Sequence, residues 1–397
     1  MIFKSFEGKK LSLLGFGAMR LPTSPDGSID EQAVFEMVKY AMAHGVNYFD
    51  TAYPYHSGLS ETVLGRILSE YPRESYYLAD KYPGHQVMSS YDPSVIFEDQ
   101  LKKCRTDYFD FYLLHNVNEQ SIKVYTDEKW GIIDYFKEQK RLGRIKHLGF
   151  STHAYAKGLE EILDLIGADM DFCQIQINYL DYSLQSAKRK YEMLSERGIP
   201  VWVMEPLRGG KLANLPDDSS LSLLLKAGMT DSPVSYAFRF LHGFDNIKMI
   251  LSGMSSFSQI KDNIEIFSEL RPLSDSETDT LFKVAEGLKK AVACTGCRYC
   301  TDGCPMGLDI PLLIAGYNDL SFSPGVSASI PLQYLSEDKR PHACINCGAC
   351  KTICPQNIDI PSVLESLSHI LDKLPKWEEV CRDREEAQKK IAENKEK

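Results

Sequence analysis

Two cysteine runs near the C-terminus have the clearest chemical meaning in this sequence. Each run reads C-x2-C-x2-C-x3-C-P, and each cysteine of the first run is matched 50 residues further along. Three closely spaced thiolates can face one corner of a cubic iron–sulfur cluster. The spacing is typical of chains that hold two [4Fe–4S] clusters, in which the fourth cysteine of each run binds the other cluster. Zinc is the alternative, but it usually takes pairs of ligands separated by longer loops.

The spacing predicts one ligand set for each cluster. We expect cluster one to bind Cys294, Cys297, Cys300 and Cys354, and cluster two to bind Cys344, Cys347, Cys350 and Cys304. The repeat continues past the cysteines, because the residues LDIP at 308–311 are matched by IDIP at 358–361. We assign no function to the remaining cysteines, which are Cys104, Cys173 and Cys381.

A second candidate site lies in the N-terminal part. Asp50, Lys81 and His115 each end a short apolar run, and Tyr55 follows five residues after Asp50. A phenol with a pKa near 10 is a poor acid at neutral pH, but an adjacent ammonium favours the phenolate and lowers that pKa. We expect Tyr55 to be a general acid whose pKa Lys81 lowers, with Asp50 anchoring Lys81. His115 would hydrogen-bond a substrate carbonyl and orient it.

These residues require a fold that brings the ends of several strands together. Eight apolar runs, several of them apolar on both faces as buried parallel strands are, alternate with helix-like stretches. The runs are residues 13–18, 46–50, 76–81, 109–115, 144–151, 172–178, 199–205 and 247–253. Eight such units over about 250 residues predict a (β/α)8 TIM barrel, in which function lies at the C-terminal strand ends. A doubly wound sheet is the alternative, but GFGAMR after the first strand lacks the expected G-x-G-x-x-G.

The sequence predicts four segments. They are a TIM barrel over residues 1–270, a linker helix over 271–293, a small, mainly α-helical iron–sulfur domain over 294–375, and a charged C-terminal helix or tail over 376–397. Ser274 and Glu277 fit a capping box at the start of the linker helix. Pro311 opens an apolar run between the two cysteine runs, which favours helices in the iron–sulfur domain.

The composition narrows the function classes. The 397 residues are 43% hydrophobic and 25% charged, the balance of an ordinary globular protein. No run approaches about eighteen apolar residues, so we expect no membrane span. The first residues do not form an apolar leader, so we expect a cytoplasmic protein whose thiols are reduced. The net charge of −10 has the wrong sign for a partner of nucleic acid.

The N-terminal part resembles the aldo-keto reductases. FDTAYPYHSGLSETVLGR, LADKYP and FDFYLLH are similar to the active-site segments of that family, and the resemblance covers roughly residues 1–270. It implies hydride transfer between a nicotinamide nucleotide and a small-molecule carbonyl, with Asp50, Tyr55, Lys81 and His115 in the roles given above. The implied nucleotide contacts are Gly17, Met19, Asp50, Ser151, Gln174, Met204, Pro206, Leu207, Gly209, Gly253, Ser255, Gln259 and Asn263.

Within these contacts, the resemblance implies a role for each segment. GFST supplies Ser151 to the nicotinamide amide with Gln174 beside it, MEPLRGGKL lies along the pyrophosphate, and ILSGMSSFSQIKDN holds the adenosine end. Three residues depart from the family. Met204 stands where the family usually has an aromatic residue that stacks on the nicotinamide. Gln259 stands where many members have an arginine for the 2′-phosphate, and Gly253 replaces a frequent lysine. The family favours NADP(H), but the missing cations leave NAD(H) as an alternative.

The cysteine runs resemble those of bacterial two-cluster ferredoxins, so the chain combines two-electron with one-electron chemistry. One hypothesis is an NAD(P)H-dependent carbonyl reductase whose clusters exchange electrons with a partner protein or are structural. A second is an enzyme that receives single electrons through the clusters and reduces a substrate such as an activated C=C bond. A third is a nucleotide-binding redox sensor without turnover. The complete Asp/Tyr/Lys/His set favours an enzyme over the sensor.

Overall fold

Each of the eight predicted strand runs overlaps one strand of a closed, parallel, eight-stranded barrel. A computed structural model describes residues 1–215, 218–269, 271–288, 292, 294, 298–322, 325–354 and 358–395. The barrel order is β10-β3-β4-β5-β6-β7-β8-β9. The strands are β3 (Leu14–Gly17), β4 (Tyr48–Asp50), β5 (Tyr77–Tyr82), β6 (Phe109–Leu114), β7 (Ile145–Thr152), β8 (Phe172–Gln176), β9 (Val201–Met204) and β10 (Ile247–Gly253). The prediction of a TIM barrel is therefore confirmed.

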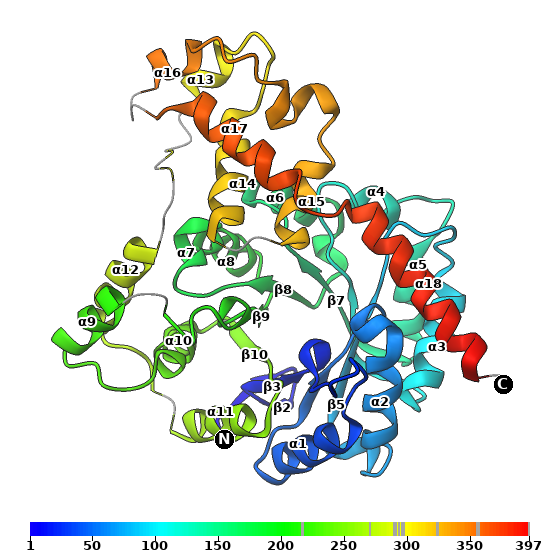
Figure 1. Cartoon of the computed structure of the whole chain (residues 1–397). Coiled ribbons are helices and arrows are strands. Elements are labelled where there is room, and N and C mark those ends of the chain that lie inside the picture. The colour runs from blue at the N-terminus through cyan, green and yellow to red at the C-terminus, as the bar shows by residue number, and fades with distance from the viewer. Residues whose placement is uncertain are drawn as a thin grey trace.

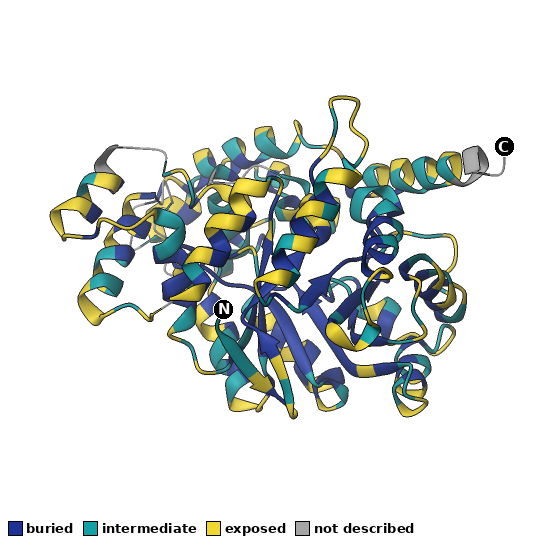
Figure 2. Cartoon of the chain, turned by 90° about the horizontal axis from the view of Figure 1, so that it is seen from below, coloured by how far each residue is buried: buried dark blue, intermediate teal, exposed yellow. Residues whose placement is uncertain are grey.

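Helices surround the barrel and bury one face against it (Figure 2). The main ones are α1 (Glu31–Ala43), α2 (Leu59–Leu68), α3 (Pro93–Cys104), α5 (Ile132–Arg141), α6 (Ala156–Ile166), α8 (Ala187–Glu196), α10 (Pro233–His242) and α11 (Phe257–Ser268). Their starts follow the local sequence. Asp30 accepts a hydrogen bond from Ala33 N–H at 3.0 Å and so caps α1, and Ser232 caps α10 just before Pro233.

A hairpin that the sequence analysis did not predict precedes the barrel. Strands β1 (Phe3–Phe6) and β2 (Lys9–Ser12) pair in antiparallel fashion, and Phe6 and Leu11 join the cluster of side chains inside the barrel. The Phe6 ring lies 5.1 Å from the Trp202 ring in an edge-on contact. The barrel is thus filled by packed side chains, and ligands must bind at the rim formed by the C-terminal strand ends.

The helix that follows the barrel packs on it. Helix α12 (Asp275–Leu288) buries Leu281, Val284 and Leu288 in the barrel's hydrophobic core. The predicted capping box is present, because Ser274 N–H donates to the Glu277 carboxylate at 2.8 Å and Glu277 N–H donates to Ser274 Oγ at 3.3 Å. Of the helices that the structure describes, none is both long and apolar enough to cross a bilayer.

The cysteine-rich domain is helical and shows its internal repeat. A short helix precedes a longer one in each half: α13 (Tyr299–Asp302) and α14 (Ile310–Phe322), then α16 (Ala349–Ile353) and α17 (Ile360–Leu371). Both short helices follow a residue with left-handed backbone, Arg298 (φ 65°) and Gly348 (φ 76°). Helices α14 and α17 pack together, while α13 and α16 lie at the end of the domain away from the barrel (Figure 1).

The chain then returns to the barrel as helix α18 (Trp377–Lys395). Its start is attached to α15 (Val326–Gln333), because Trp377 N–H donates to Gln333 Oε1 at 2.7 Å. Further along, α18 contacts the turn η2 (Tyr55–Gly58), which follows β4. Figure 1 shows α18 running across the helices on that side of the barrel. The segment predicted as a charged helix or tail is thus, over its described residues, a helix against the barrel rim.

Candidate active site and cluster site

The predicted catalytic residues meet at the barrel rim. Gly17 pairs with Asp50 between β3 and β4, and Lys81 lies in β5, which pairs with β4 on the other side. His115 follows β6 directly, and its backbone N–H donates to Tyr82 O at 3.0 Å. Parallel strands that close a barrel bring their C-terminal ends to one rim. Residues far apart in the sequence are therefore neighbours here.

Lys81 is the centre of this group. Its Nζ donates to Asp50 Oδ1 at 2.5 Å and to the Thr51 carbonyl oxygen at 2.7 Å, and lies 3.4 Å from Tyr55 Oη. The Lys81 side chain is fully buried and that of Asp50 almost so. On the other side of Tyr55, the His115 ring lies 5.9 Å away at an angle of 85°. The predicted Asp/Tyr/Lys/His group is thus assembled around one phenol.

A strained turn holds Tyr55 in this position. His56 and Ser57, which follow it in η2, both have positive φ values, 49° and 54°, which are uncommon for residues other than glycine. His56 Nε2 accepts a hydrogen bond from Leu21 N–H at 3.1 Å, which ties the turn to the loop after β3. The backbone therefore directs the Tyr55 hydroxyl toward Lys81 at a local energetic cost.

The pKa values of the group only partly match the expectation. Burial raises the pKa of Tyr55 above its usual value, and Lys81 only partly offsets this rise. The predicted net lowering of the Tyr55 pKa is therefore wrong, because desolvation outweighs the ammonium. Burial, His85 and Lys81 together hold the pKa of His115 well below its usual value. At neutral pH, Tyr55 thus keeps its proton and His115 is uncharged, so both can donate a hydrogen bond.

The residues expected at the nicotinamide lie on adjacent strands. Ser151 of β7 pairs with Gln174 of β8, and β9 beside them ends at Met204. Ser151 Oγ accepts a hydrogen bond from Asn116 N–H at 2.8 Å. Gln174 is buried, and its Oε1 has no hydrogen-bond partner among the described residues. A buried acceptor without a donor is costly, so the amide of a ligand fits this position.

The residues expected along the rest of the nucleotide lie on both sides of β10. In the loop after β9, Pro206 is buried, and Gly209 has a left-handed backbone with φ 66°. Leu207 is half-buried in the same loop. Gly253 pairs with Gly17 between β10 and β3, and Met19 follows β3 in η1 (Ala18–Arg20) with 56% of its surface exposed.

At the start of α11, side chains bind neighbouring groups of the chain itself. Gln259 Oε1 accepts a hydrogen bond from Ser255 N–H at 2.7 Å. Asn263 is buried and donates to Ser252 Oγ at 3.1 Å. The structure therefore places Ser255 and Gln259 at the helix start, where an anion can bind, and uses Asn263 to attach α11 to β10.

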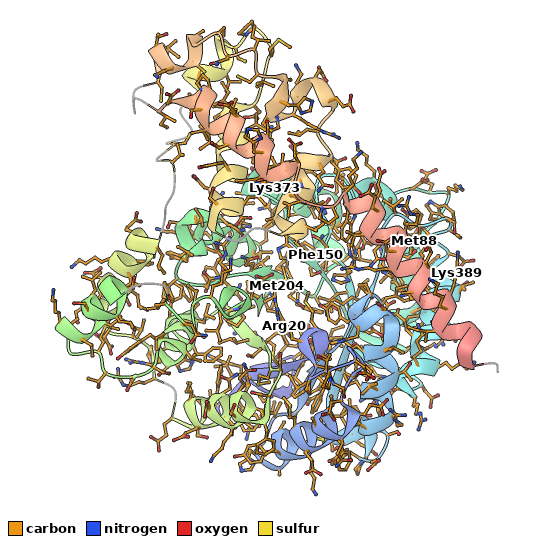
Figure 3. All side chains as sticks on the ribbon, viewed as in Figure 1. Arg20, Met88, Phe150, Met204, Lys373 and Lys389 are labelled. Atoms are coloured by element: carbon orange, nitrogen blue, oxygen red, sulfur yellow. The ribbon has the colours of Figure 1, made fainter. Side chains whose placement is uncertain are left out.

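Several cations near the rim were missed by the sequence analysis. A cavity of about 390 Å³ lies between the barrel and the cluster domain. Its lining includes Arg20 (labelled in Figure 3), Lys190 and Arg208 from the barrel and Asp319 from α14. Arg208 forms ion pairs with Asp181 of the barrel and with Asp319, so this contact joins the two domains. In the sequence, Arg208 lies in the loop LRGG, which is assigned to the nucleotide without a role for its arginine.

The cysteines predicted for cluster two line a single pocket. They are Cys304, Cys344, Cys347 and Cys350. Burial and the neighbouring Cys344 raise the pKa of Cys350 to about 11. Among the described residues, no three thiol, imidazole or carboxylate groups converge closely enough to hold one metal ion. Four cysteines that line one pocket are the number of donors that a [4Fe–4S] cluster needs, and their assignment to cluster two stays a prediction.

The set predicted for cluster one is only partly described. Cys300 is buried in the domain core, and Cys294 and Cys354 pack against that core. Cys297, the fourth predicted ligand, lies outside the described residues. The three described cysteines belong to the same small domain, and their assignment to one cluster stays a prediction.

Comparison with known proteins identifies a family for each of the two parts of the chain. The model of the aldo/keto reductase family matches residues 13–286, and that of a 4Fe-4S dicluster domain matches residues 293–358. The chain belongs to the aldo/keto reductase family. It is thus an oxidoreductase, and it carries a 4Fe-4S dicluster domain at its C-terminal end, as the two resemblances implied.

Individual relatives match the barrel part at low identity. L-galactose dehydrogenase of Arabidopsis thaliana is 26% identical over 294 residues, which cover 68% of this chain and 89% of that protein. NADH-specific methylglyoxal reductase of Escherichia coli is 23% identical over an alignment that covers 70% of this chain and 96% of that protein. The solved structure of aldo-keto reductase AKR11C1 from Bacillus halodurans matches with a TM-score of 0.58 at 26% identity, covering 70% and 93%.

Proposed function

We propose that this enzyme reduces an aldehyde or ketone by hydride transfer from NAD(P)H. The observation that carries this proposal is the Lys81 ammonium, which touches both Asp50 and the Tyr55 hydroxyl inside a closed barrel rim. Reductases among the relatives act on related groups, as the names methylglyoxal reductase and alpha-keto amide reductase state for those proteins.

Each residue of the group has a defined task in this reaction. The substrate oxygen lies between Tyr55 and His115 and accepts a hydrogen bond from each, which polarises the carbonyl. Tyr55 then transfers its proton to the developing alkoxide as general acid. The Lys81 ammonium stabilises the phenolate that is left, and Asp50 holds the ammonium in place. The bound nucleotide supplies the hydride.

We propose that NADP(H) binds along the rim, with NAD(H) as the alternative. Gln174 and Ser151 would hold the carboxamide, with Met204 against the ring. The rest of the nucleotide would be surrounded by the remaining expected contacts, which are Gly17, Met19, Asp50, Pro206, Leu207, Gly209, Gly253, Ser255, Gln259 and Asn263. Gln259 accepts a hydrogen bond from Ser255 and offers no cation to a 2′-phosphate. The property to measure is therefore the ratio of the dissociation constants for NADPH and NADH.

We propose that the domain holds two [4Fe–4S] clusters with the two ligand sets given above. Cys347 is exposed, and helices α13 and α16 lie away from the barrel (Figure 1). This placement suits exchange with an electron-transfer protein, or a structural role, better than direct supply of single electrons to the rim. The one-electron-fed reductase is therefore the second candidate. Reduced thiols suit a cytoplasmic location, and the net charge of −10 is unfavourable for nucleic acid.

The test uses the iron-replete full chain under anaerobic conditions with a panel of aldehydes. Tyr55→Phe should lower kcat about 10²- to 10⁴-fold, the usual contribution of a general acid, while the dissociation constant for NADPH stays close to that of the wild type. Tyr53→Phe, two residues earlier, is the matched control and should retain activity. If the Tyr55→Phe variant keeps its turnover, the assignment of Tyr55 as the general acid is wrong. A nucleotide that binds without any turnover would favour the sensor.

A further inference from the structure

Helix α18 presents a continuous inner face to the substrate side of the barrel rim. The side chains of Trp377, Cys381, Arg384 and Gln388 follow one another at helical spacing on this face. Cys381 is buried. Gln388 lies against Gly58, in the loop that carries Tyr55, so closely that a Cβ added to this glycine would be 3.1 Å from Gln388 Nε2. Figure 3 shows Met88, from the loop after β5, beside α18. This face therefore covers the loops after β4 and β5.

A row of rings leads from the catalytic tyrosine to this helix. The His115 ring, next to Tyr55, lies 4.4 Å from the ring of His85, which belongs to the loop after β5. The His85 ring in turn stacks on Trp377 at 5.9 Å with an angle of 24°. His85 is 9% exposed, and its Nδ1 has no hydrogen-bond partner among the described residues. A buried nitrogen without a partner, next to the His115 ring, is suited to a second polar group of a ligand.

Arg384 adds a positive charge to the same place. Its guanidinium lies 5.4 Å from the centre of the Trp377 ring and is partly buried. Burial and, to a smaller extent, the charge of Arg384 lower the pKa of His85 to about 3. Arg384 makes a smaller contribution to the low pKa of His115 than burial, His85 and Lys81 do. The guanidinium is therefore within electrostatic reach of both histidines. Neither histidine is charged at neutral pH, so neither can supply a cation in its place.

No carboxylate of the described residues forms an ion pair with Arg384. The helix is rich in acidic residues, but the positions one turn away on its own face are Val380, Cys381, Ala387 and Gln388. Arg382, by contrast, is exposed to solvent on the outer side of the helix. A partly buried cation without an anion is unfavourable unless a ligand supplies the partner. The nucleotide is not that partner, because its expected contacts, apart from Asp50 at the end of β4, lie on β7 to β10 and β3 or in the segments that follow these strands, across the rim.

We propose that Arg384 binds a carboxylate of the substrate, so that the preferred substrates are carbonyl compounds that carry an acidic group. The proposal rests on the proposed carbonyl reductase function and adds the substrate class. Arg384 forms charge-assisted, bidentate hydrogen bonds to the carboxylate. Trp377 holds the guanidinium by its ring, and His85 donates or accepts a hydrogen bond along the substrate between Arg384 and His115.

The test compares matched substrates with the iron-replete full chain and NADPH. A short series of ω-oxo carboxylates is measured beside the n-alkanals of equal chain length, and the ratio of kcat/KM is recorded for each pair. We expect the wild type to prefer the best acid over its neutral counterpart by about 10- to 100-fold, as for a charge-assisted hydrogen bond. Arg384→Gln should bring this ratio close to one, mainly through KM. Arg384→Lys should restore part of it, and Arg382→Gln should keep the wild-type ratio.

Two results would overturn the proposal. One is a wild-type ratio near one for every pair. The other is an equal loss for acids and alkanals in Arg384→Gln, which would make Arg384 a structural residue of α18. If no carbonyl of either series is reduced, the proposed function fails, and titration with succinate decides the carboxylate site separately. Quenching of tryptophan fluorescence by succinate in the wild type but not in Arg384→Gln supports the site, and equal or no quenching in both removes it.

Discussion

Lys81→Met should lower the free energy of unfolding by about 3–5 kcal/mol, the usual cost of removing one partner of a buried ion pair. Lys81 Nζ lies 2.5 Å from Asp50 Oδ1, and both side chains are buried. The methionine leaves the Asp50 carboxylate and the Thr51 carbonyl oxygen without their donor. Urea unfolding followed by tryptophan fluorescence measures the loss. Lys140→Met is the control, because Lys140 pairs with Asp171 in a partly exposed position, where the loss should be clearly smaller, about 1 kcal/mol.

The double variant Asp50→Leu/Lys81→Met separates stability from chemistry. Removing both charges should recover most of the lost stability, because apolar side chains of similar volume often replace a buried ion pair without loss. Carbonyl reduction should not recover, because Tyr55 still lacks its ammonium. If activity returns with stability, Lys81 only supports the fold, and the catalytic role assigned to it is wrong. A loss below about 1 kcal/mol in Lys81→Met would refute the buried pair itself.

The remaining predictions concern pH, iron and the domain contact. Because the pKa of Tyr55 is raised and that of His115 lowered, kcat/KM for reduction should be flat through neutrality. It should fall only above the ordinary tyrosine value of about 10, where the acid loses its proton; a fall between pH 6 and 8 would contradict this assignment. Cys347→Ala should lower the iron content per chain by colorimetric assay, whereas Cys173→Ala, in β8, should not; unchanged iron in the first variant would refute the ligand set. Asp319→Asn should speed hydrogen–deuterium exchange in α14 without affecting the barrel strands, and an unchanged rate would show that its pair with Arg208 does not secure the domains.

The fold and the catalytic group were predictable because a parallel barrel imposes strict geometry. Eight apolar runs specify eight strands, and closure brings their C-terminal ends together whatever the distance along the chain. Asp50, Lys81 and His115 could therefore be placed at one rim from the sequence alone. The cysteine spacing was equally informative, since a 50-residue repeat of four ligands implies two similar half-domains.

What could not be predicted depends on packing between distant segments. The net pKa of Tyr55 depends on how deeply the barrel buries it, which spacing does not reveal. The hairpin β1–β2 has only four residues in each strand and forms against side chains inside the barrel. The segment of helix α18 looked like a solvated charged helix or a frayed tail because acidic and basic side chains are equally frequent in it. The spacing of Trp377, Cys381 and Arg384 on one face was the available sign that it packs.

The measurement that tests the central claim most directly follows the fate of one hydrogen atom. The iron-replete protein is incubated without oxygen with NADPH deuterated at both positions of C4 and with an aldehyde, while electron paramagnetic resonance monitors the clusters. Hydride transfer predicts one deuterium on the former carbonyl carbon of each alcohol and clusters whose signal does not change during turnover. An alcohol without deuterium, formed while the clusters cycle between redox states, would contradict it.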